Sequence, residues 1–159
     1  MNILIIGGGI SGISAAKVLL KSHHNVSIVE KKEEPGGLME KIANCRIGFK
    51  TFFDEIRDNP NLTIHKGTEI SAAKRVNDKF VVRFEDKNEM YYDKVIISTG
   101  LTPYDPKHLK GKRILTSLEY DAMIDQRNAE LPDIGNIAFV LCVGSRGSEY
   151  PLCSSVCCS

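Results

Sequence analysis

Apolar residues follow two different patterns in the first part of the chain, and together they predict an α/β fold. Short, mainly apolar runs at residues 1–6, 26–29 and 95–98 predict strands buried on both faces, as in a parallel sheet. Apolar and small residues at helical spacing from Ile10 to Ser22 predict a helix between the first two strands. The order strand, helix, strand is that of a βαβ unit.

Between the second and third of these runs, apolar residues occur in short groups separated by turn residues. Asn77-Asp78 and Asp86-Lys87-Asn88 are such turns. We expect an antiparallel meander here, inserted between the parallel elements, with four strands at residues 62–65, 69–76, 80–85 and 89–92.

Three further elements are predicted from local signals. Residues 49–57 form an amphipathic pattern that ends before Asn59-Pro60, which indicates a short helix. Thr116-Ser117-Leu118-Glu119 is a capping box, so a second helix is expected from Ser117 to Arg127. The apolar run at residues 137–143 predicts a last strand.

Length and composition describe an ordinary globular protein. The 159 residues suffice for one domain with a core, and 42% are hydrophobic against 26% charged. The net charge of +1 gives no reason to expect nucleic acid or an anionic membrane as a partner. No apolar run approaches the roughly 20 residues of a membrane span, and no secretory signal begins the chain, so a cytoplasmic location is expected.

The first strand ends in the motif Gly7-Gly8-Gly9-Ile10-Ser11-Gly12, which fits G-x-G-x-x-G. Glycines at these places allow a tight turn, a close backbone approach to a pyrophosphate, and close packing of helix and sheet. Glu30 follows Gly12 by eighteen residues and ends the second strand, where a carboxylate accepts hydrogen bonds from ribose hydroxyls and repels a 2′-phosphate. This context predicts an ADP site, the alternative being a ligand-free turn with Glu30 solvated.

FAD and NAD share this motif, and a resemblance distinguishes them. Val29-Glu30-Lys31, Pro35-Gly36-Gly37-Leu38 and the segment 93–100, which ends in Ser98-Thr99-Gly100, resemble the signatures of two-dinucleotide-binding-domain flavoproteins. The resemblance implies a Rossmann-like FAD-binding domain with a parallel sheet and a β-meander, incomplete at the C-terminus; the alternative is an NAD-only domain. The residues expected to bind the cofactor are Gly7, Gly8, Gly9, Ile10, Ser11, Gly12, Glu30, Lys31, Gly37, Leu38, Ile70, Thr99 and Gly100.

Four of the five cysteines gather at the end of the chain, at Cys142, Cys153, Cys157 and Cys158. Their spacing, C-x10-C-x3-C-C, leaves an iron–sulfur cluster, a zinc ion and a redox dithiol all open. Cys45 stands alone, and a lone cysteine is more often a small buried apolar residue than a ligand.

A second resemblance narrows the role of these cysteines. Residues 139–146 and 150–158, preceded by residues 113–120, are similar to a signature of the family formed by the A subunit of heterodisulfide reductase. The resemblance implies that the four cysteines at 142, 153, 157 and 158 ligate a [4Fe–4S] cluster near FAD, in an electron-transfer oxidoreductase without a catalytic side chain. It also implies an FAD domain at residues 1–135 and the start of another domain at 136–159.

The resemblance further implies association with other chains. Expected partners are other electron-transfer subunits or a chain that completes the FAD domain, in an oligomer or complex. The alternatives are a pyridine-nucleotide disulfide oxidoreductase with redox-active cysteines and a non-catalytic nucleotide-binding module.

Overall fold

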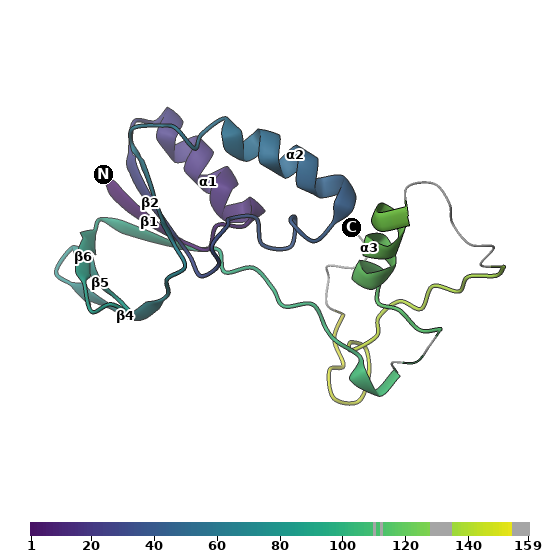
Figure 1. The fold of residues 1–159 in the computed structure, drawn as a ribbon. Coiled ribbons are helices and arrows are strands. Elements are labelled where there is room, and N and C mark those ends of the chain that lie inside the picture. The colour runs from purple at the N-terminus through teal and green to yellow at the C-terminus, as the bar shows by residue number, and fades with distance from the viewer. Residues whose placement is uncertain (110, 112, 128–134, 154–159) are drawn as a thin grey trace. The chain divides into compact units, whose positions relative to one another are not determined.

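The computed structural model describes residues 1–109, 111, 113–127 and 135–153 (Figure 1). The chain packs as two compact units, Met1–Leu101 and Thr102–Ser159. This division reflects packing within each unit, so the domain boundary expected at residue 135 stays a prediction.

The first unit is built on a four-stranded parallel sheet in the order β3-β2-β1-β7. Helix α1 (Ile10–Lys21) connects β1 (Asn2–Ile6) to β2 (Asn25–Glu30), and these two strands pair in parallel. The predicted βαβ unit and the α/β fold class are therefore confirmed. Because the carboxyl ends of parallel strands lie at one edge of the sheet, the glycine motif after β1 and Glu30 at the end of β2 are neighbours.

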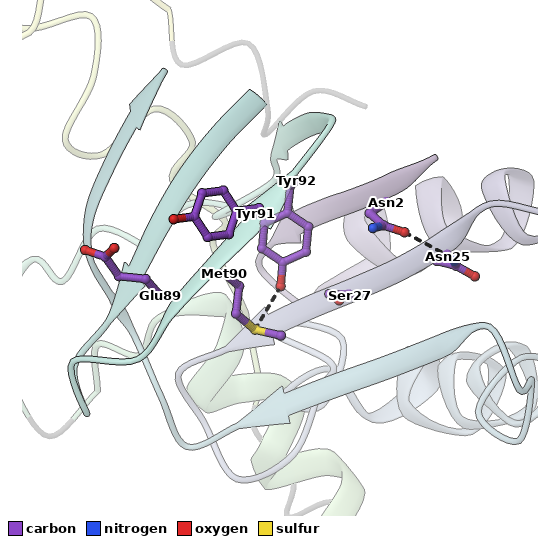
Figure 2. Close-up of a pocket in the computed structure, with 7 residues that line it drawn as sticks. All are labelled: Asn2, Asn25, Ser27, Glu89, Met90, Tyr91 and Tyr92. Carbon is purple, nitrogen blue, oxygen red and sulfur yellow. Dashed lines mark hydrogen bonds between the residues drawn. The ribbon is translucent and has the colours of Figure 1, made fainter. Parts of the chain in front are cut away.

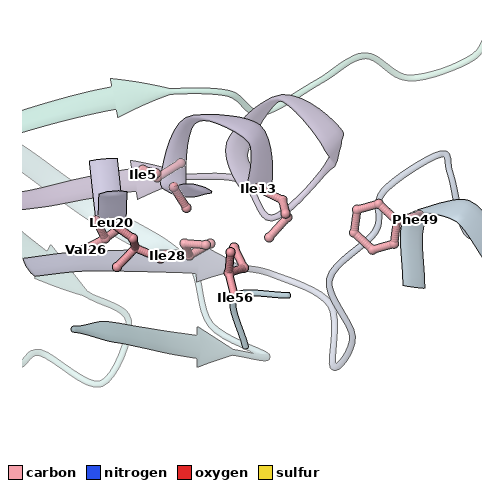
Figure 3. Packing of buried hydrophobic residues seen from close by; sticks show 8 residues of the cluster. Ile5, Ile13, Leu20, Val26, Ile28, Phe49 and Ile56 are labelled. Carbon is pink, nitrogen blue, oxygen red and sulfur yellow. The ribbon is translucent and has the colours of Figure 1, made fainter. Parts of the chain in front are cut away.

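Two helices cover one face of this sheet, α1 and α2 (Ala43–Asp54) (Figure 1). Apolar residues of both helices, of β1 and β2, and of the turn after α2 form the first core cluster (Figure 3). Its buried members are Ile5, Ile13, Ala16, Leu20, Val26, Ile28, Phe49 and Ile56. The helix expected at residues 49–57 is present but begins at Ala43 and ends at Asp54. Its first turns have no continuous apolar face, which is why the sequence pattern does not mark its start.

The opposite face of the sheet carries a three-stranded antiparallel sheet, β4-β5-β6. These strands are β4 (Ile70–Val76), β5 (Lys79–Phe84) and β6 (Glu89–Tyr92). Side chains from both sheets form the second core cluster, made of Leu4, Val29, Val82, Phe84 and Tyr92. The predicted meander is therefore present, with three strands of the four expected.

The strand expected at residues 62–65 is present, but its predicted place in the antiparallel meander is wrong. Residues 62–65 lie in β3 (Leu62–Lys66), which pairs in parallel with β2 at the edge of the main sheet. Its residues Leu62 and Ile64 pack against the first core cluster, whereas His65 contacts Phe84 on the other side. An edge strand that is only partly covered shows the same alternation of apolar and polar residues in a parallel and in an antiparallel sheet. The sequence could therefore not identify the strand with which residues 62–65 pair.

The last strand of the main sheet, β7 (Lys94–Ile97), pairs in parallel with β1. The sequence predicts a buried strand at residues 95–98, but β7 is an edge strand and Ile97 is 75% exposed. The apolar composition of this strand therefore exceeds what its neighbours in the described part of the chain bury.

The second unit contains a 3₁₀ turn, η1 (Lys107–Leu109), and helix α3 (Ser117–Arg127). The capping box that predicts α3 is confirmed, because the Thr116 hydroxyl accepts the Glu119 N–H at 3.2 Å and the Glu119 carboxylate accepts the Thr116 N–H at 2.7 Å. The strand predicted at residues 137–143 is wrong, since these residues form no strand and Val140 is 76% exposed. A strand needs a hydrogen-bonded neighbour, and the described residues provide none for this run.

Candidate dinucleotide-binding site

The turn between β1 and α1 has a backbone that requires glycine. Gly7 has φ +106°, and its N–H donates to the Val29 carbonyl at 2.8 Å. A Cβ at Gly7 would overlap the backbone carbonyl of Ser98, and a Cβ at Gly12 would overlap the Gly7 carbonyl oxygen. Gly7 and Gly12 therefore let the first turn of α1 pack directly against the ends of β1 and β7, as the motif predicts.

Gly9, between them, faces open space. A Cβ there would meet no atom within 4 Å, so its backbone is accessible to a ligand. Gly9 is also the N-cap of α1, with no side-chain cap and no acidic residue in the first turn. Amides in the first turn of a helix lack intrahelical acceptors and carry partial positive charge. Ile10 and Ser11, in this turn, are both exposed, so the turn can accept the phosphates of a ligand.

Glu30 is the one buried charged side chain in the described part of the chain, at 7% exposure. One carboxylate oxygen accepts the Gly8 N–H at 2.8 Å, and the other accepts the Lys32 N–H at 3.0 Å. Glu30 is therefore not a solvated strand end. Its carboxylate lies against the glycine turn, and its remaining lone pairs can accept hydrogen bonds from ribose hydroxyls.

The segment that contains Gly36 and Gly37 lies against the same turn. The Gly36 N–H donates to the Gly8 carbonyl at 2.9 Å, and Gly36 forms a parallel bridge with Gly9. Gly37 has φ +60°, and a Cβ there would lie 3.4 Å from the Gly9 Cα. The two glycine segments, residues 7–9 and 36–37, therefore form one backbone surface, which we call the glycine surface. Leu38, which follows, is half-buried.

The end of β7 completes this surface. Ser98 donates its N–H to the Ile6 carbonyl at 2.8 Å, and exposed Thr99 and Gly100 follow it. The Ser98 hydroxyl also reaches the Ile6 and Gly7 carbonyls, each at 3.1 Å. The sequence predicted Thr99 and Gly100 as site residues but not Ser98, because a single serine at a strand end does not reveal a contact with Gly7, 91 residues away.

Two expected contacts lie at the edge of this region. Lys31 is exposed beside Glu30. Ile70 begins β4 and packs against the second core cluster. The Thr68 N–H donates to the Glu30 carbonyl at 3.3 Å, which ties the start of β4 to the end of β2. Ligand contacts of Lys31 and Ile70, like those of the other predicted site residues, stay predictions.

The cysteine cluster is described only in part. Cys142 is half-buried and Cys153 exposed, while Cys157 and Cys158 lie outside the described residues. Between Cys142 and Cys153 the chain folds back on itself, since Arg146 N–H donates to the Leu152 carbonyl at 3.3 Å. Within the described ranges, no three His, Cys, Asp or Glu side chains come together as a metal site.

A separate depression of about 330 Å³ lies at the other end of the sheet (Figure 2). Asn2 and Asn25, at the amino ends of β1 and β2, line it together with Met90 and Tyr92 of β6. Burial raises the pKa of the Tyr92 phenol, whose hydroxyl lies 3.4 Å from the Met90 sulfur. Ligands of open α/β sheets bind at the carboxyl ends of the strands, so the glycine surface is the better candidate site.

One protein family and several known proteins are similar to this chain. Residues 1–143 match the family described as pyridine nucleotide-disulphide oxidoreductase. The A subunit of a heterodisulfide reductase from Methanosarcina acetivorans is 34% identical over 95 residues, which are 54% of this chain and 12% of that protein. The NADH glutamate synthase of Schizosaccharomyces pombe is 31% identical over 102 residues, 64% of this chain and 5% of that enzyme.

Among solved structures, the thioredoxin reductase of T. acidophilum superposes with a TM-score of 0.58 at 26% identity. The match covers 65% of this chain and 36% of the reductase. This chain therefore spans only a small part of each of these relatives. In the described residues, no helix is long and apolar enough to cross a membrane.

Proposed function

Because this chain belongs to the pyridine nucleotide-disulphide oxidoreductase family, we propose that its glycine surface binds the adenosine diphosphate half of FAD. The observation that carries the proposal is the contact between Glu30 and the glycine turn, in which a buried carboxylate accepts the Gly8 N–H at 2.8 Å. A buried carboxylate is costly unless it is well paired, so its position at this edge favours a binding role.

Each part of the surface has a separate task in this proposal. The uncapped first turn of α1 binds the pyrophosphate, and the open side of Gly9 lets the backbone approach it. Glu30 accepts the ribose hydroxyls, and its charge disfavours a 2′-phosphate. When bound, FAD supplies the exchange of electron pairs and single electrons, while the protein supplies position and electrostatics.

We further propose that the chain is part of an electron-transfer protein similar to the A subunit of heterodisulfide reductase. The identity of 34% to that relative supports this, together with the four clustered cysteines. In this proposal Cys142, Cys153, Cys157 and Cys158 ligate a [4Fe–4S] cluster. The structure describes two of these four residues, so the geometry of the cluster stays a prediction.

A redox dithiol is the second candidate for the same cysteines. The thioredoxin reductase of T. acidophilum, at 26% identity, supports it. The two candidates differ in iron content and in the number of thiols that react with an alkylating reagent.

Association with another chain is proposed from the edge of the main sheet. Strand β7 has no neighbour on its outer side among the described strands, and its residue Ile97 is 75% exposed. An uncovered apolar edge favours pairing with a further strand. Another electron-transfer subunit, or a chain that completes the FAD domain, would provide it.

Three measurements on protein purified without oxygen test these proposals together: an absorbance spectrum, the iron content, and the number of thiols that react with an alkylating reagent. Flavin bands, retained or restored after FAD is added, are expected if the glycine surface binds FAD. A broad additional shoulder with about four iron atoms per chain is expected for the cluster. Reactive thiols without iron would favour the dithiol. A colourless protein that does not bind added FAD would refute the flavin proposal.

A further inference from the structure

We propose that Ser98 is a positioning residue of the dinucleotide site, which acts by fixing the peptide unit between Gly7 and Gly8. The inference rests on the proposed function, because it assigns a role in ADP binding to a residue outside the expected contacts.

The Ser98 hydroxyl lies between two backbone carbonyls of the glycine turn. Its oxygen is 3.1 Å from the Ile6 carbonyl oxygen and 3.1 Å from the Gly7 carbonyl oxygen. The Ile6 carbonyl also accepts the Ser98 N–H at 2.8 Å, so it has a second donor. For the Gly7 carbonyl, the Ser98 hydroxyl is the one donor found among the described residues.

The other end of the same peptide unit is bound to Glu30. A peptide is planar, so the Gly7 carbonyl and the Gly8 N–H turn together. The Gly8 N–H donates to the Glu30 carboxylate at 2.8 Å. Ser98 at the end of β7 and Glu30 at the end of β2 therefore hold one peptide plane from opposite sides, and any rotation of that plane weakens both bonds.

Helix α1 packs closely against Ser98, and the Gly7 backbone has no side chain to restrict it. A Cβ added at Gly12 would lie 2.9 Å from the Ser98 hydroxyl oxygen, which shows how closely α1 approaches Ser98. Gly7 has φ +106°, a region where glycine is flexible because no side chain restricts it. The hydrogen bond from the Ser98 hydroxyl therefore restricts the Gly7 backbone, which has no side chain to do so.

The consequence for the ligand follows along the chain. The next peptide is bound through its Gly8 carbonyl to the Gly36 N–H at 2.9 Å, and Gly9 is then the N-cap of α1. The orientation of the Gly7–Gly8 peptide thus sets both the Glu30 carboxylate, which faces the ribose, and the amides that face the pyrophosphate. Loss of the Ser98 hydroxyl is expected to loosen these two groups together.

The matched pair Ser98→Ala and Ser71→Ala tests this role. The Ser71 hydroxyl also reaches two backbone carbonyls, those of Arg83 and Phe84, each at 3.1 Å, but it lies in the β4-β5 meander. Each substitution removes one hydroxyl and adds no atom. By calorimetry, Ser98→Ala is expected to bind ADP about fivefold more weakly than wild type. Ser71→Ala is expected to keep the wild-type affinity.

A second measurement needs no ligand. The Gly8 ratio is the hydrogen-exchange rate of the Gly8 amide divided by that of core amides, both in the ligand-free protein. This ratio is expected to be about fivefold higher in Ser98→Ala than in wild type. Ser71→Ala is expected to leave the Gly8 ratio unchanged. This ratio separates local release of the peptide from a general loss of stability.

The outcomes distinguish this inference from the proposed function. If wild type binds ADP but Ser98→Ala keeps both its affinity and the Gly8 ratio, the inference is wrong and the proposed function stands. Equal weakening by Ser98→Ala and Ser71→Ala, with no local change at Gly8, also overturns the inference. A wild-type protein that does not bind ADP overturns both.

Discussion

Replacing Glu30 by glutamine tests how the carboxylate supports the glycine turn. The two carboxylate oxygens accept the Gly8 N–H at 2.8 Å and the Lys32 N–H at 3.0 Å. Glutamine has nearly the same shape, but its amide nitrogen cannot accept a hydrogen bond. One of these two N–H groups must therefore lose its acceptor in Glu30→Gln.

The size of the effect follows from burial. Glu30 is only 7% exposed, so water replaces the lost acceptor poorly. An unpaired buried donor costs about 1–3 kcal/mol, and we expect the free energy of unfolding to fall by about 2 kcal/mol. Urea denaturation measures this change, and Glu34→Gln serves as the control. Glu34 is exposed and pairs with Lys66 at 3.0 Å, so its substitution should cost less than about 1 kcal/mol.

Binding of ADP and of its 2′-phosphorylated analogue provides a second readout of the same variant. Glu30→Gln is expected to bind ADP about tenfold more weakly, because a charged acceptor for the ribose hydroxyls is lost. Its discrimination against the 2′-phosphate is expected to narrow, since the repelling charge is absent. Unchanged stability together with unchanged discrimination would refute the role assigned to Glu30.

Two further predictions concern the turn and the pH dependence of stability. Gly12→Ala is expected to lower the free energy of unfolding, measured by urea denaturation, by about 3 kcal/mol, because its Cβ would overlap the Gly7 carbonyl. Gly48→Ala is the control, since a Cβ at Gly48 meets no atom within 4 Å. The hydrogen bond from the Asn2 N–H, more than the charge of Lys79, lowers the pKa of the Asp93 carboxyl in the folded protein. The ionised carboxyl therefore stabilises the fold above its unfolded pKa of about 4, and this stabilisation is lost as the pH falls through its folded pKa. Asp93→Asn should flatten the acid side of the stability curve, and a curve identical to that of wild type would contradict this.

The features that local sequence determines were predictable. Strand β1, the glycine turn and α1 follow from residues close together in the chain, and the pattern also placed Glu30 at the end of β2. The bond from the Gly8 N–H to the Glu30 carboxylate is a finding of the structure. The capping box at the start of α3 is likewise a contact between residues three apart. Such signals need no knowledge of the tertiary fold.

The features that depend on distant partners were not predictable. Strand β3 pairs with β2 rather than with the meander, and its alternation fits both sheets. Residues 137–143 have the composition of a strand, but no described strand pairs with them. Ser98 contacts Gly7, 91 residues away in the chain, and a single serine at a strand end gives no sign of such a bond.

In the proposed function, FAD binds at the carboxyl edge of the parallel sheet, between the glycine turn and Glu30. Titration of the labelled protein with FAD, followed by amide chemical shifts, tests it most directly. The largest shifts are expected at Gly9, Ser11 and Gly37 and next to Glu30. The depression lined by Asn2 and Tyr92 is expected to show none. Saturable shifts at that depression with none at the glycine turn, or no shifts at all, would contradict the claim.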